Sequence, residues 1–458
     1  MESPTPQIPS EGHSNSKAAL GRKARLYFQV ILLISHGLLS CILLVLLIVL
    51  LYRSIPTAIE KEAFPKELVL SHLRGVGDSL HQENSAERMQ EIFPEGASFM
   101  YTLYGMAWSN ALPHLSSGER AEGLAELRFV LERQLDPVVV QPFTDTEVHR
   151  GVFWLGQRNL ILGHYLKALP VEERPANWVT EFQENSRALY DAFRASNTHH
   201  LNAYPGLSWA ADNITALRSL LLHDELYATN YRQAYEEWKA WTITHFDPET
   251  QLPASHLNTS TGFLLEPARG CTNSWIIPLI AEDDPEFAKE LSDRYLQHFA
   301  IRRLGYRMLR EWPESHEGQS GDIDSGPVVW DAGMTATGVG LAMARSQGDT
   351  HLEADIRDLS HLFGFPSQKH QDGQTTTKYL YGMLPVGDAF LAWGYSIQRP
   401  EAQSLEIPTR MQRLLERWPW FAILSLGLLL LIIFSVWRGK RLLKSYRDLK
   451  ASYLAQTT

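Results

Sequence analysis

Cysteine is almost absent from this chain, and patterns that bind metals are missing. Only two cysteines occur in 458 residues, Cys41 and Cys271. They are too few for the disulfide framework that stabilises many small secreted domains, so stability must come from a large hydrophobic core. The 17 histidines form no His-Glu-x-x-His motif, and no Cys-x-x-Cys pair occurs. We therefore expect neither a resident metal nor a cofactor.

Positive charge is scarce in the central part of the chain. Residues 53–417 hold 32 Lys and Arg against 49 Asp and Glu, a net charge of −17. Nucleic acids and anionic lipid surfaces attract basic proteins, so this balance argues against both as partners of the central part. The glycine-rich segment 333–340 has no Gly-Lys-Ser/Thr after it and no strand before it. We expect this segment to serve helix packing and not phosphate binding.

Two long runs contain no charged residue. Residues 30–52 and 418–437 are apolar over 23 and 20 residues, and a helix of about 20 such residues crosses a membrane. The first run is too long for a cleaved signal peptide, and no small-x-small cleavage site follows it. The sequence therefore predicts a transmembrane helix at each end, with a water-soluble domain over 53–417 between them.

Basic residues indicate how the chain is oriented in the membrane. Four precede the first span within 17–25 and six follow the second within 438–450, whereas three arginines lie at 410–417. Because Lys and Arg near a span stay in the cytoplasm, we predict cytoplasmic tails at 1–29 and 438–458. The domain at 53–417 is then extracytoplasmic, either periplasmic or at the cell surface. The apolar faces of the two spans allow pairing between copies of the chain, so a homo-oligomer is possible.

The central domain shows helical periodicity and no alternating strand pattern longer than a few residues. Helices are predicted near 57–80, 95–112, 117–134, 146–168, 171–195, 211–226, 229–246, 271–282, 284–300, 329–346, 350–363 and 382–397. Charged amphipathic members alternate with members rich in Gly, Ala and aromatic residues, as outer and inner rings of helices should. Twelve such helices predict an all-α (α/α)6 toroid. An open superhelix is the alternative, but no repeat of 30–45 residues is present.

The second half of this domain carries a family resemblance. The first matching segment is 213–227, in which Asn213 stands before an apolar helix. The matching motifs that follow are Thr229-Asn-Tyr231, Phe246-Asp-Pro-Glu-Thr250, Cys271-Thr-Asn-Ser-Trp275 and Asp284-Pro-Glu-Phe287. Weaker matches lie at 338–342 and 388–391. Over about 180 residues, and most strongly over 203–299, this pattern resembles the linalool dehydratase/isomerase family.

The resemblance implies an (α/α)6 toroid but not the family's reaction. The cysteine pair expected of the family falls on Asp212 and Ala203 here, and its histidine falls on Gln157. Thiol chemistry at that place is therefore excluded, and activity on linalool-like alcohols is in doubt.

Residues 203–213 combine aromatic side chains with a carboxylate just before an expected inner helix. A Pro-Gly turn brings Tyr204 and Trp209 close to that helix, and Asp212 and Asn213 lie at its first turn. Loops at one end of the inner helices line the central funnel of a toroid, where a sugar ring would need aromatic and acidic groups. We predict that Asp212 is catalytic and that Tyr204, Trp209 and Asn213 bind substrate. A simple helix-capping role for Asp212 or Asn213 stays open.

A second acidic segment precedes another expected inner helix. Residues 311–331 contain Glu311, Asp322, Asp324 and Asp331, with Trp312 and Trp330 between them. Two carboxylates whose pKa values differ can act as general acid and general base. We predict that Asp324 pairs with Asp212 across the funnel and that Trp330 binds substrate. A solvated acidic loop is one alternative; a calcium loop is another, although the closing Glu of an EF-hand is missing.

Three further residues come from other inner helices. Asp388 follows Pro-Val-Gly at a helix start and is either a cap or a third catalytic carboxylate. Trp275 and Tyr381 are predicted to contact substrate. Cys271 has no nearby His or Asp in the sequence, so we expect a small buried residue and not a nucleophile.

These features suggest three functions. The first is an acid/base hydrolase or lyase acting on a glycan or lipid-linked sugar. The second is a hydro-lyase or isomerase of a prenyl alcohol, which needs an apolar funnel floor. The third is a non-catalytic binding or assembly protein, whose function would survive neutralisation of Asp212 and Asp324.

Overall fold

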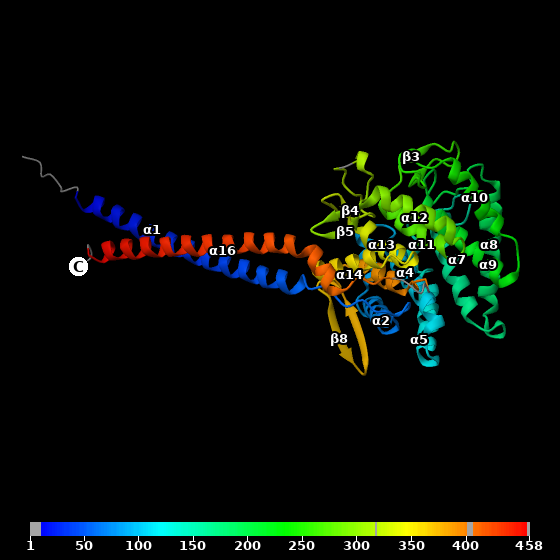
Figure 1. The fold of residues 1–458 in the computed structure, drawn as a ribbon, viewed down its shortest axis with the longest axis horizontal. Coiled ribbons are helices and arrows are strands. Elements are labelled where there is room, and N and C mark those ends of the chain that lie inside the picture. Colours follow the sequence, from blue (N-terminus) through cyan, green and yellow to red (C-terminus); the bar gives the residue numbers. More distant parts are fainter. Residues whose placement is uncertain (1–10, 317, 401–405, 456–458) are drawn as a thin grey trace, which may run out of the picture. The chain divides into compact units, whose positions relative to one another are not determined.

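The computed structural model describes residues 11–316, 318–400 and 406–455 (Figure 1). The chain divides into two compact units. One comprises Met1–Pro56 and Met411–Thr458, and the other, called the toroid unit below, comprises Thr57–Arg410.

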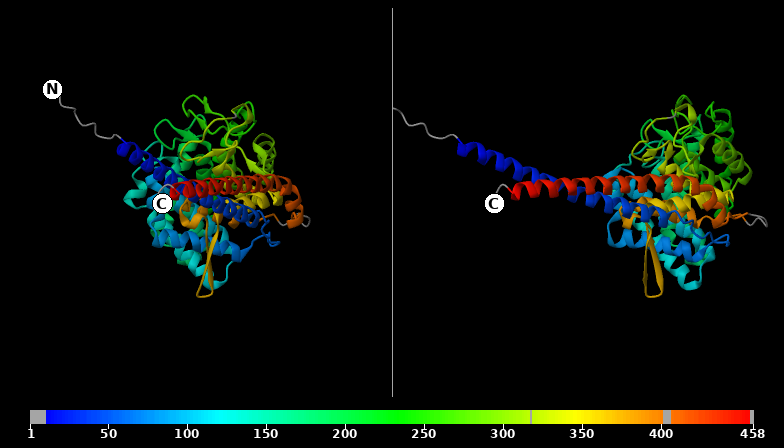
Figure 2. Two further views of the ribbon diagram at one scale, coloured as in Figure 1. Left: turned by 90° about the vertical axis from the view of Figure 1, so that its left-hand side faces the viewer. Right: turned by 60° about the vertical axis from the view of Figure 1, so that its left-hand side comes forward.

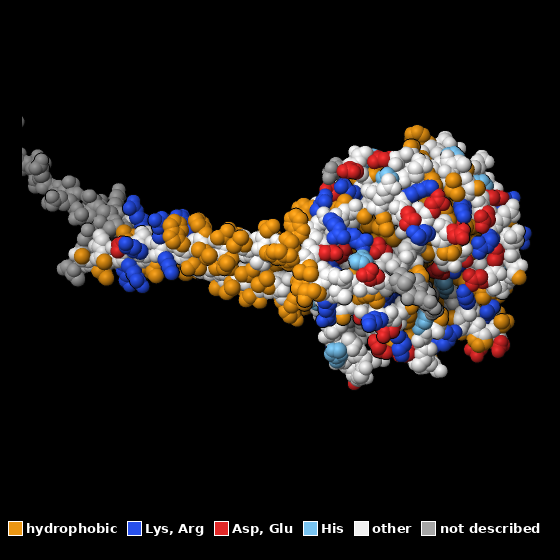
Figure 3. All heavy atoms as spheres, viewed as in Figure 1, with side chains coloured by type: hydrophobic (Ala, Val, Ile, Leu, Met, Phe, Trp, Pro, Cys, Tyr) orange, Lys and Arg blue, Asp and Glu red, His pale blue; other side chains and the backbone are white. Residues whose placement is uncertain are grey.

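The first unit consists of two long helices, α1 (Glu11–Arg53) and α16 (Arg410–Leu454). Both are long and apolar enough to cross a membrane, and the predicted spans lie within them. Their middle portions are covered with hydrophobic side chains, and Lys and Arg gather near the C-terminal end of α16 (Figure 3). The Ser40 hydroxyl donates a hydrogen bond to the Ser435 hydroxyl over 3.0 Å, so the two helices lie side by side. The orientation of the chain in a membrane stays a prediction.

Six helices of the toroid unit form a closed inner ring. They are α4 (Gly96–Ala111), α7 (Gly151–Ala168), α9 (Ala210–Tyr227), α11 (Gly270–Ala281), α13 (Met334–Ser346) and α15 (Pro385–Ser396). Each packs against the next in this order, and α15 packs against α4. Two further views of these helices are given in Figure 2. The all-α (α/α)6 toroid predicted from the sequence is therefore confirmed.

Six outer helices cover this ring. They are α2 (Lys66–Gln82), α5 (Ser117–Arg133), α8 (Ala176–Ala195), α10 (Arg232–Thr244), α12 (Pro285–Phe299) and α14 (Thr350–Gly364). Each packs on an inner helix: α2 on α15, and each of the others on the inner helix that precedes it in the chain. Amphipathic patterning explains their position. In α8, for example, Phe182, Leu189 and Phe193 share one face and are fully buried.

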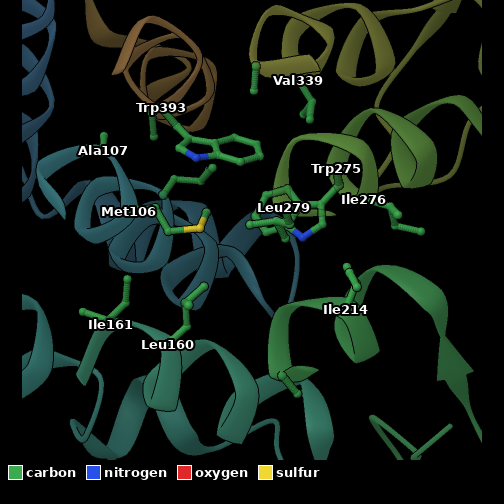
Figure 4. Packing of buried hydrophobic residues seen from close by; sticks show 14 of the residues in the cluster. Met106, Ala107, Leu160, Ile161, Ile214, Trp275, Ile276, Leu279, Val339 and Trp393 are labelled. Carbon is green, nitrogen blue, oxygen red and sulfur yellow. The ribbon is translucent and has the colours of Figure 1, made fainter. Parts of the chain in front are cut away.

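Large apolar side chains fill the middle of the ring. The rings of Trp275 in α11 and Trp393 in α15 have centroids 4.9 Å apart. Figure 4 shows these two with Met106, Ile161 and Ile214, which come from three other inner helices. Burial of each such side chain stabilises the fold by about 1.5–3 kcal/mol relative to exposure. The core therefore holds the ring together without disulfides.

A buried arginine joins the two ends of the toroid unit. Arg345 in α13 forms an ion pair with Glu353 in α14, with 2.5 Å between Nη1 and Oε1. It also donates to the carbonyl of Ile397, after α15, and to that of Ala63, before α2. Because both chain ends bind one guanidinium, the first and last helices of the unit are held next to each other.

The structure differs from the predicted helix map in several places. Helix α3 (Ser85–Ile92) was not predicted. Helix α2 begins at Lys66 and not near residue 57. Helix α13 begins at Met334, later than predicted, because strands β6 (Val328–Val329) and β7 (Ala332–Gly333) precede it. The other elements are α6 (Pro137–Val140), β1 (Ser208–Trp209), β2 (His256–Leu257), β3 (Leu264–Glu266), β4 (Ala300–Arg303), β5 (Tyr306–Leu309), β8 (Ser367–Gln371), β9 (Gln374–Lys378) and 3₁₀ turns at 112–114, 171–173, 314–316 and 380–382. The longest of these strands, β8 and β9, form an antiparallel hairpin.

Candidate active site

A cavity of about 710 Å³ lies within the toroid unit. Side chains from all six inner helices line it, together with residues of α3, α14 and the loops between helices. The lining is mostly apolar, with the aromatic residues Phe99, Phe153, Tyr204, Trp209 and Trp275 on its wall. Several acidic side chains lie within this mostly apolar lining.

Asp212 lies in the first turn of α9 and faces the cavity. Its pKa is well above the ordinary value, first because the carboxyl group is desolvated and then because Glu95 and Asp324 carry negative charge nearby. Burial and the two neighbouring carboxylates therefore favour the protonated form of Asp212, which is the form that a general acid requires.

Asp324 lies on the exposed side of the same cavity. Partial desolvation and the charges of Glu95 and Asp322 raise its pKa to about 6, while Arg269 opposes the shift. At neutral pH Asp324 is therefore mostly ionised, whereas the surroundings of Asp212 favour its protonated form. The two carboxyl groups predicted as a pair therefore line one cavity, and Asp212 is the more buried of the two.

The loop that carries Asp324 is held in place by its neighbours. The backbone N–H of Asp322 donates to the Ser325 hydroxyl over 3.0 Å, and the N–H of Ser325 donates to Asp322 Oδ1 over 2.8 Å. Arg269 binds the other oxygen of Asp322 at 2.6 Å. Although burial opposes it, this pairing lowers the pKa of Asp322 to about 2. Asp322 thus anchors the loop and leaves Asp324 free to face the cavity.

Glu95 is a third carboxylate of the site that the sequence analysis missed. It precedes α4, lines the cavity and accepts a hydrogen bond from the Tyr204 hydroxyl. Its charge contributes to the raised pKa of both Asp212 and Asp324. Nothing in the segment Phe93-Pro-Glu-Gly distinguishes Glu95 from an ordinary residue at a helix start.

The loop with Tyr204 approaches α7 very closely. Gly151 begins α7 with a φ of +74°, and a Cβ atom there would lie 2.0 Å from the carbonyl oxygen of Ala203. The N–H of Val152 donates to the carbonyl of Asn202 over 3.0 Å. Only glycine allows both this backbone conformation and this contact, so Gly151 helps to position Tyr204.

A buried cluster supports the wall beneath the acidic loop. Glu311 is fully buried and accepts hydrogen bonds from Arg269 Nε at 2.8 Å and from the Cys271 thiol at 3.0 Å. Burial raises the pKa of Glu311, and Arg269 counteracts this. Burial and Glu311 raise the pKa of Cys271 well above that of an ordinary thiol. Cys271 is therefore a hydrogen-bonding thiol and not a thiolate nucleophile.

Asp388 lines another part of the cavity. Its Oδ1 accepts a hydrogen bond from the N–H of Tyr379 at 2.8 Å, so it ties down the preceding turn and does not cap α15. Among the described residues, Oδ2 has no hydrogen-bond partner. Burial raises the pKa of Asp388 to about 7. It is a buried carboxyl group near its titration midpoint at neutral pH.

Two of the predicted aromatic residues are held in fixed orientations. Trp209 stacks on His256, with ring centroids 4.8 Å apart and an angle of 14° between the planes. Trp275 donates its indole N–H to the hydroxyl of Thr215 over 3.0 Å. Together with Tyr204, these residues form an ordered aromatic wall.

Three predicted binding residues are not among the described residues that line the cavity. Asn213 is fully buried and binds both backbone groups of Leu201, so it holds the loop together. Trp330 and Tyr381 are 64% and 76% exposed and lie in turns with positive φ. The expected substrate contacts of Asn213, Trp330 and Tyr381 in the funnel are therefore not seen.

The described residues contain no group of three or more His, Cys, Asp or Glu that could hold a metal ion. An ion pair made by the acidic loop disfavours the calcium alternative. One of its expected ligands, Asp322, is bound to Arg269.

No protein-family model matches the sequence, and no curated protein is significantly similar to it. The resemblance to linalool dehydratase/isomerase thus stays a prediction. Three of the solved structures that match each share 11% identity with this chain. An unsaturated glucuronyl hydrolase specific for heparin has a TM-score of 0.42 and covers 65% of this chain and 84% of its own. A family 76 glycoside hydrolase from a bovine Bacteroides thetaiotaomicron strain has a TM-score of 0.38, with coverages of 65% and 68%. A family 105 glycoside hydrolase from C. acetobutylicum ATCC 824 has a TM-score of 0.43, with coverages of 71% and 99%.

Proposed function

We propose that this protein is an acid/base enzyme, a hydrolase or lyase acting on a glycan, with Asp212 as general acid and Asp324 as general base. The observation that carries the proposal is the pair itself. Two carboxyl groups with differently raised pKa values line one aromatic-walled cavity. Such a pair supplies both proton transfers that cleavage of a glycosidic bond requires.

In hydrolysis, Asp212 gives its proton to the glycosidic oxygen as the bond between that oxygen and the anomeric carbon breaks. Asp324 takes a proton from a water molecule, whose oxygen forms the new bond to the anomeric carbon. In a lyase, Asp324 instead removes a proton from the sugar carbon next to the one that bears the leaving oxygen. Tyr204, Trp209 and Trp275 offer aromatic faces to the C–H groups of a sugar ring.

The test compares membranes carrying the wild type, Asp212→Asn or Asp324→Asn after incubation with envelope glycan and lipid extract. With the wild type, mass spectrometry should find a cleaved sugar, with one water added in hydrolysis or with an unsaturated sugar end in a lyase reaction. Each variant should lower the rate by about 10²–10⁴-fold, the usual contribution of general acid/base catalysis. Asp293→Asn is the matched control, because Asp293 is exposed on outer helix α12. Folded variants that leave the extract changed as the wild type does would overturn the proposal.

A second candidate is a hydro-lyase or isomerase acting on a prenyl alcohol. The mostly apolar lining of the cavity favours it. Asp212 would protonate the hydroxyl group that leaves as water, and Asp324 would remove a proton from the neighbouring carbon. The same extracts separate the two candidates: a hydro-lyase removes one water from an alcohol and releases no sugar, and an isomerase changes the chromatographic retention of an alcohol without changing its mass. Extracts identical with and without the wild type would instead support a binding or assembly protein.

A further inference from the structure

The cavity does not end at the acidic residues. It also extends to outer helix α14, and residues of inner helices α13 and α15 line it there. This arm of the cavity is lined mainly by Met308, Ile356, Leu359, Phe363, Leu384 and Leu391, and Asp388 lies between the last two residues along the chain. A sugar ring bound at Asp212 and Asp324 needs no such apolar extension.

The arm has unfilled space beside two glycines. Gly338 of α13 and Gly387 of α15 both line the cavity. A Cβ atom built on Gly338 meets no described atom within 4 Å, and one on Gly387 meets only Leu384 at ordinary contact distance. Gly338 lies inside α13, where glycine costs stability relative to alanine, so its presence keeps the arm wide at an energetic cost.

The arm opens outward through apolar side chains. Ile356 and Leu359 are buried deep in it, whereas Phe363 and Leu384 are 57% and 47% exposed. The neighbouring Met383 is 69% exposed. A hydrocarbon chain lying in the arm can therefore continue past this rim into an apolar phase.

The charges of the lining limit what the chain can be attached to. Among the described lining residues, six carboxyl groups are present: Glu95, Asp212, Glu266, Asp322, Asp324 and Asp388. The one cationic side chain there, Arg269, is bound to Glu311 and Asp322. A phosphate group would meet several negative charges and no free cation, which disfavours its binding.

We propose that the substrate is an uncharged glycolipid, a sugar joined directly to a long hydrocarbon chain, with the sugar at Asp212 and Asp324 and the chain in the arm. This inference rests on the proposed glycan-acting function and narrows its substrate class. It excludes sugars carried on a lipid phosphate. Each methylene buried in the arm should tighten binding by about threefold to fourfold.

The test uses the full chain in lipid nanodiscs and a dodecyl glucoside whose alkyl chain carries a diazirine near its end. After illumination, mass spectrometry should locate the label on peptides containing Ile356, Leu359 or Met308. Unlabelled dodecyl glucoside should compete at least tenfold better than dodecyl phosphate. Label on α1 and α16 serves as an internal reference, because those helices are apolar and exposed.

Gly338→Phe fills the arm where a side chain meets nothing, and it should reduce label on these peptides at least tenfold relative to α1 and α16. Gly118→Phe is the matched control: the same change at an exposed position of α5 with open space around it. Both variants should melt near the temperature of the wild type, a measurement that checks whether they fold. Equal labelling of the arm in wild type and Gly338→Phe would overturn the proposal, and equal competition by dodecyl phosphate would overturn its uncharged head group.

Photolabelling of the arm does not require turnover. The experiments can therefore contradict the enzymatic function and the glycolipid substrate independently of each other. A protein that is labelled in the arm but changes no extract would contradict the enzymatic function and leave the arm as a lipid site. Turnover of a water-soluble glycan without label in the arm would contradict the glycolipid and leave the acid/base pair.

Discussion

The hydroxyl group of Tyr204 donates a hydrogen bond to the carboxylate of Glu95. This bond joins the loop before α9 to the start of α4, two inner helices that are separated in the ring by α7. It holds the Glu95 charge at the wall of the cavity, where that charge raises the pKa of Asp212 and of Asp324. Glu95 therefore tunes both proposed catalytic groups from one position.

Replacing Glu95 with Gln should move the pH dependence of activity without abolishing it. Removal of the negative charge makes ionisation of Asp212 and Asp324 easier, so both pKa values fall. The rising limb, set by Asp324 with a pKa of about 6, and the falling limb, set by Asp212, should both shift to lower pH by about 0.5–1 unit. The measurement is kcat/KM against pH. Glu91→Gln, at an exposed position of neighbouring α3, should leave both limbs in place. A lower rate with unmoved limbs would contradict this role of Glu95.

Asp388→Asn should stabilise the protein at alkaline pH. The pKa of Asp388 is raised from 3.8 to about 7 in the folded state, so between these values the folded state holds a proton that the unfolded state has lost. The free energy of unfolding therefore decreases as pH rises through this range, by up to about 4 kcal/mol in all. Asn cannot ionise and removes this loss.

The measurement is the melting temperature of both proteins at pH 5 and at pH 8. The advantage of the variant should be larger at pH 8. Asp372→Asn, an exposed change in the β8–β9 turn, should show the same difference at both pH values. An advantage of Asp388→Asn that does not grow with pH would show that the Asp388 carboxyl titrates normally.

The ring of helices could be predicted because it depends on local patterns. Amphipathic and apolar helices alternate along the chain, and Pro, Gly, Asn and Asp separate many of them. The β8–β9 hairpin also has a local signal, an Asp372-Gly373 pair with φ values of +52° and +76° at the turn. Asp-Gly between two strands is a common signature of a tight hairpin turn, but the polar strands on either side do not alternate in hydrophobicity.

The site was only partly predictable because side-chain direction changes with every residue. Asp212 and Asn213 are adjacent at the start of α9, and one step along a helix rotates the side chain by about 100°. Asp212 consequently faces the cavity while Asn213 faces the core. Glu95 is more than 100 positions from Tyr204, and only closure of the ring brings the two together. No local pattern records such a contact.

The buried ion pair between Arg345 and Glu353 should be far more important for stability than a surface pair. Both side chains are 1% exposed or less, so Glu353→Ala leaves a charged guanidinium in the core without its partner. This change should cost about 3–5 kcal/mol. Glu132→Ala, which removes a pair with Arg128 between two exposed side chains, should leave the melting temperature nearly unchanged. Thermal unfolding followed by circular dichroism compares the two, and similar losses would show that Glu353 is not a structural partner.

Cys271 should resist alkylation in the folded protein. Burial and the neighbouring Glu311 raise the pKa of its thiol, and only the thiolate reacts rapidly with iodoacetamide. In a Cys41→Ser background, alkylation at pH 8 should be at least about tenfold slower than in the denatured chain. Glu311→Gln removes the negative charge and leaves the positive charge of Arg269, so the thiol should become more acidic and react faster. If Cys271 already reacts in the folded wild type as fast as in the denatured chain, the thiol is ionised, and it would become a candidate nucleophile of this cavity beside Asp212 and Asp324.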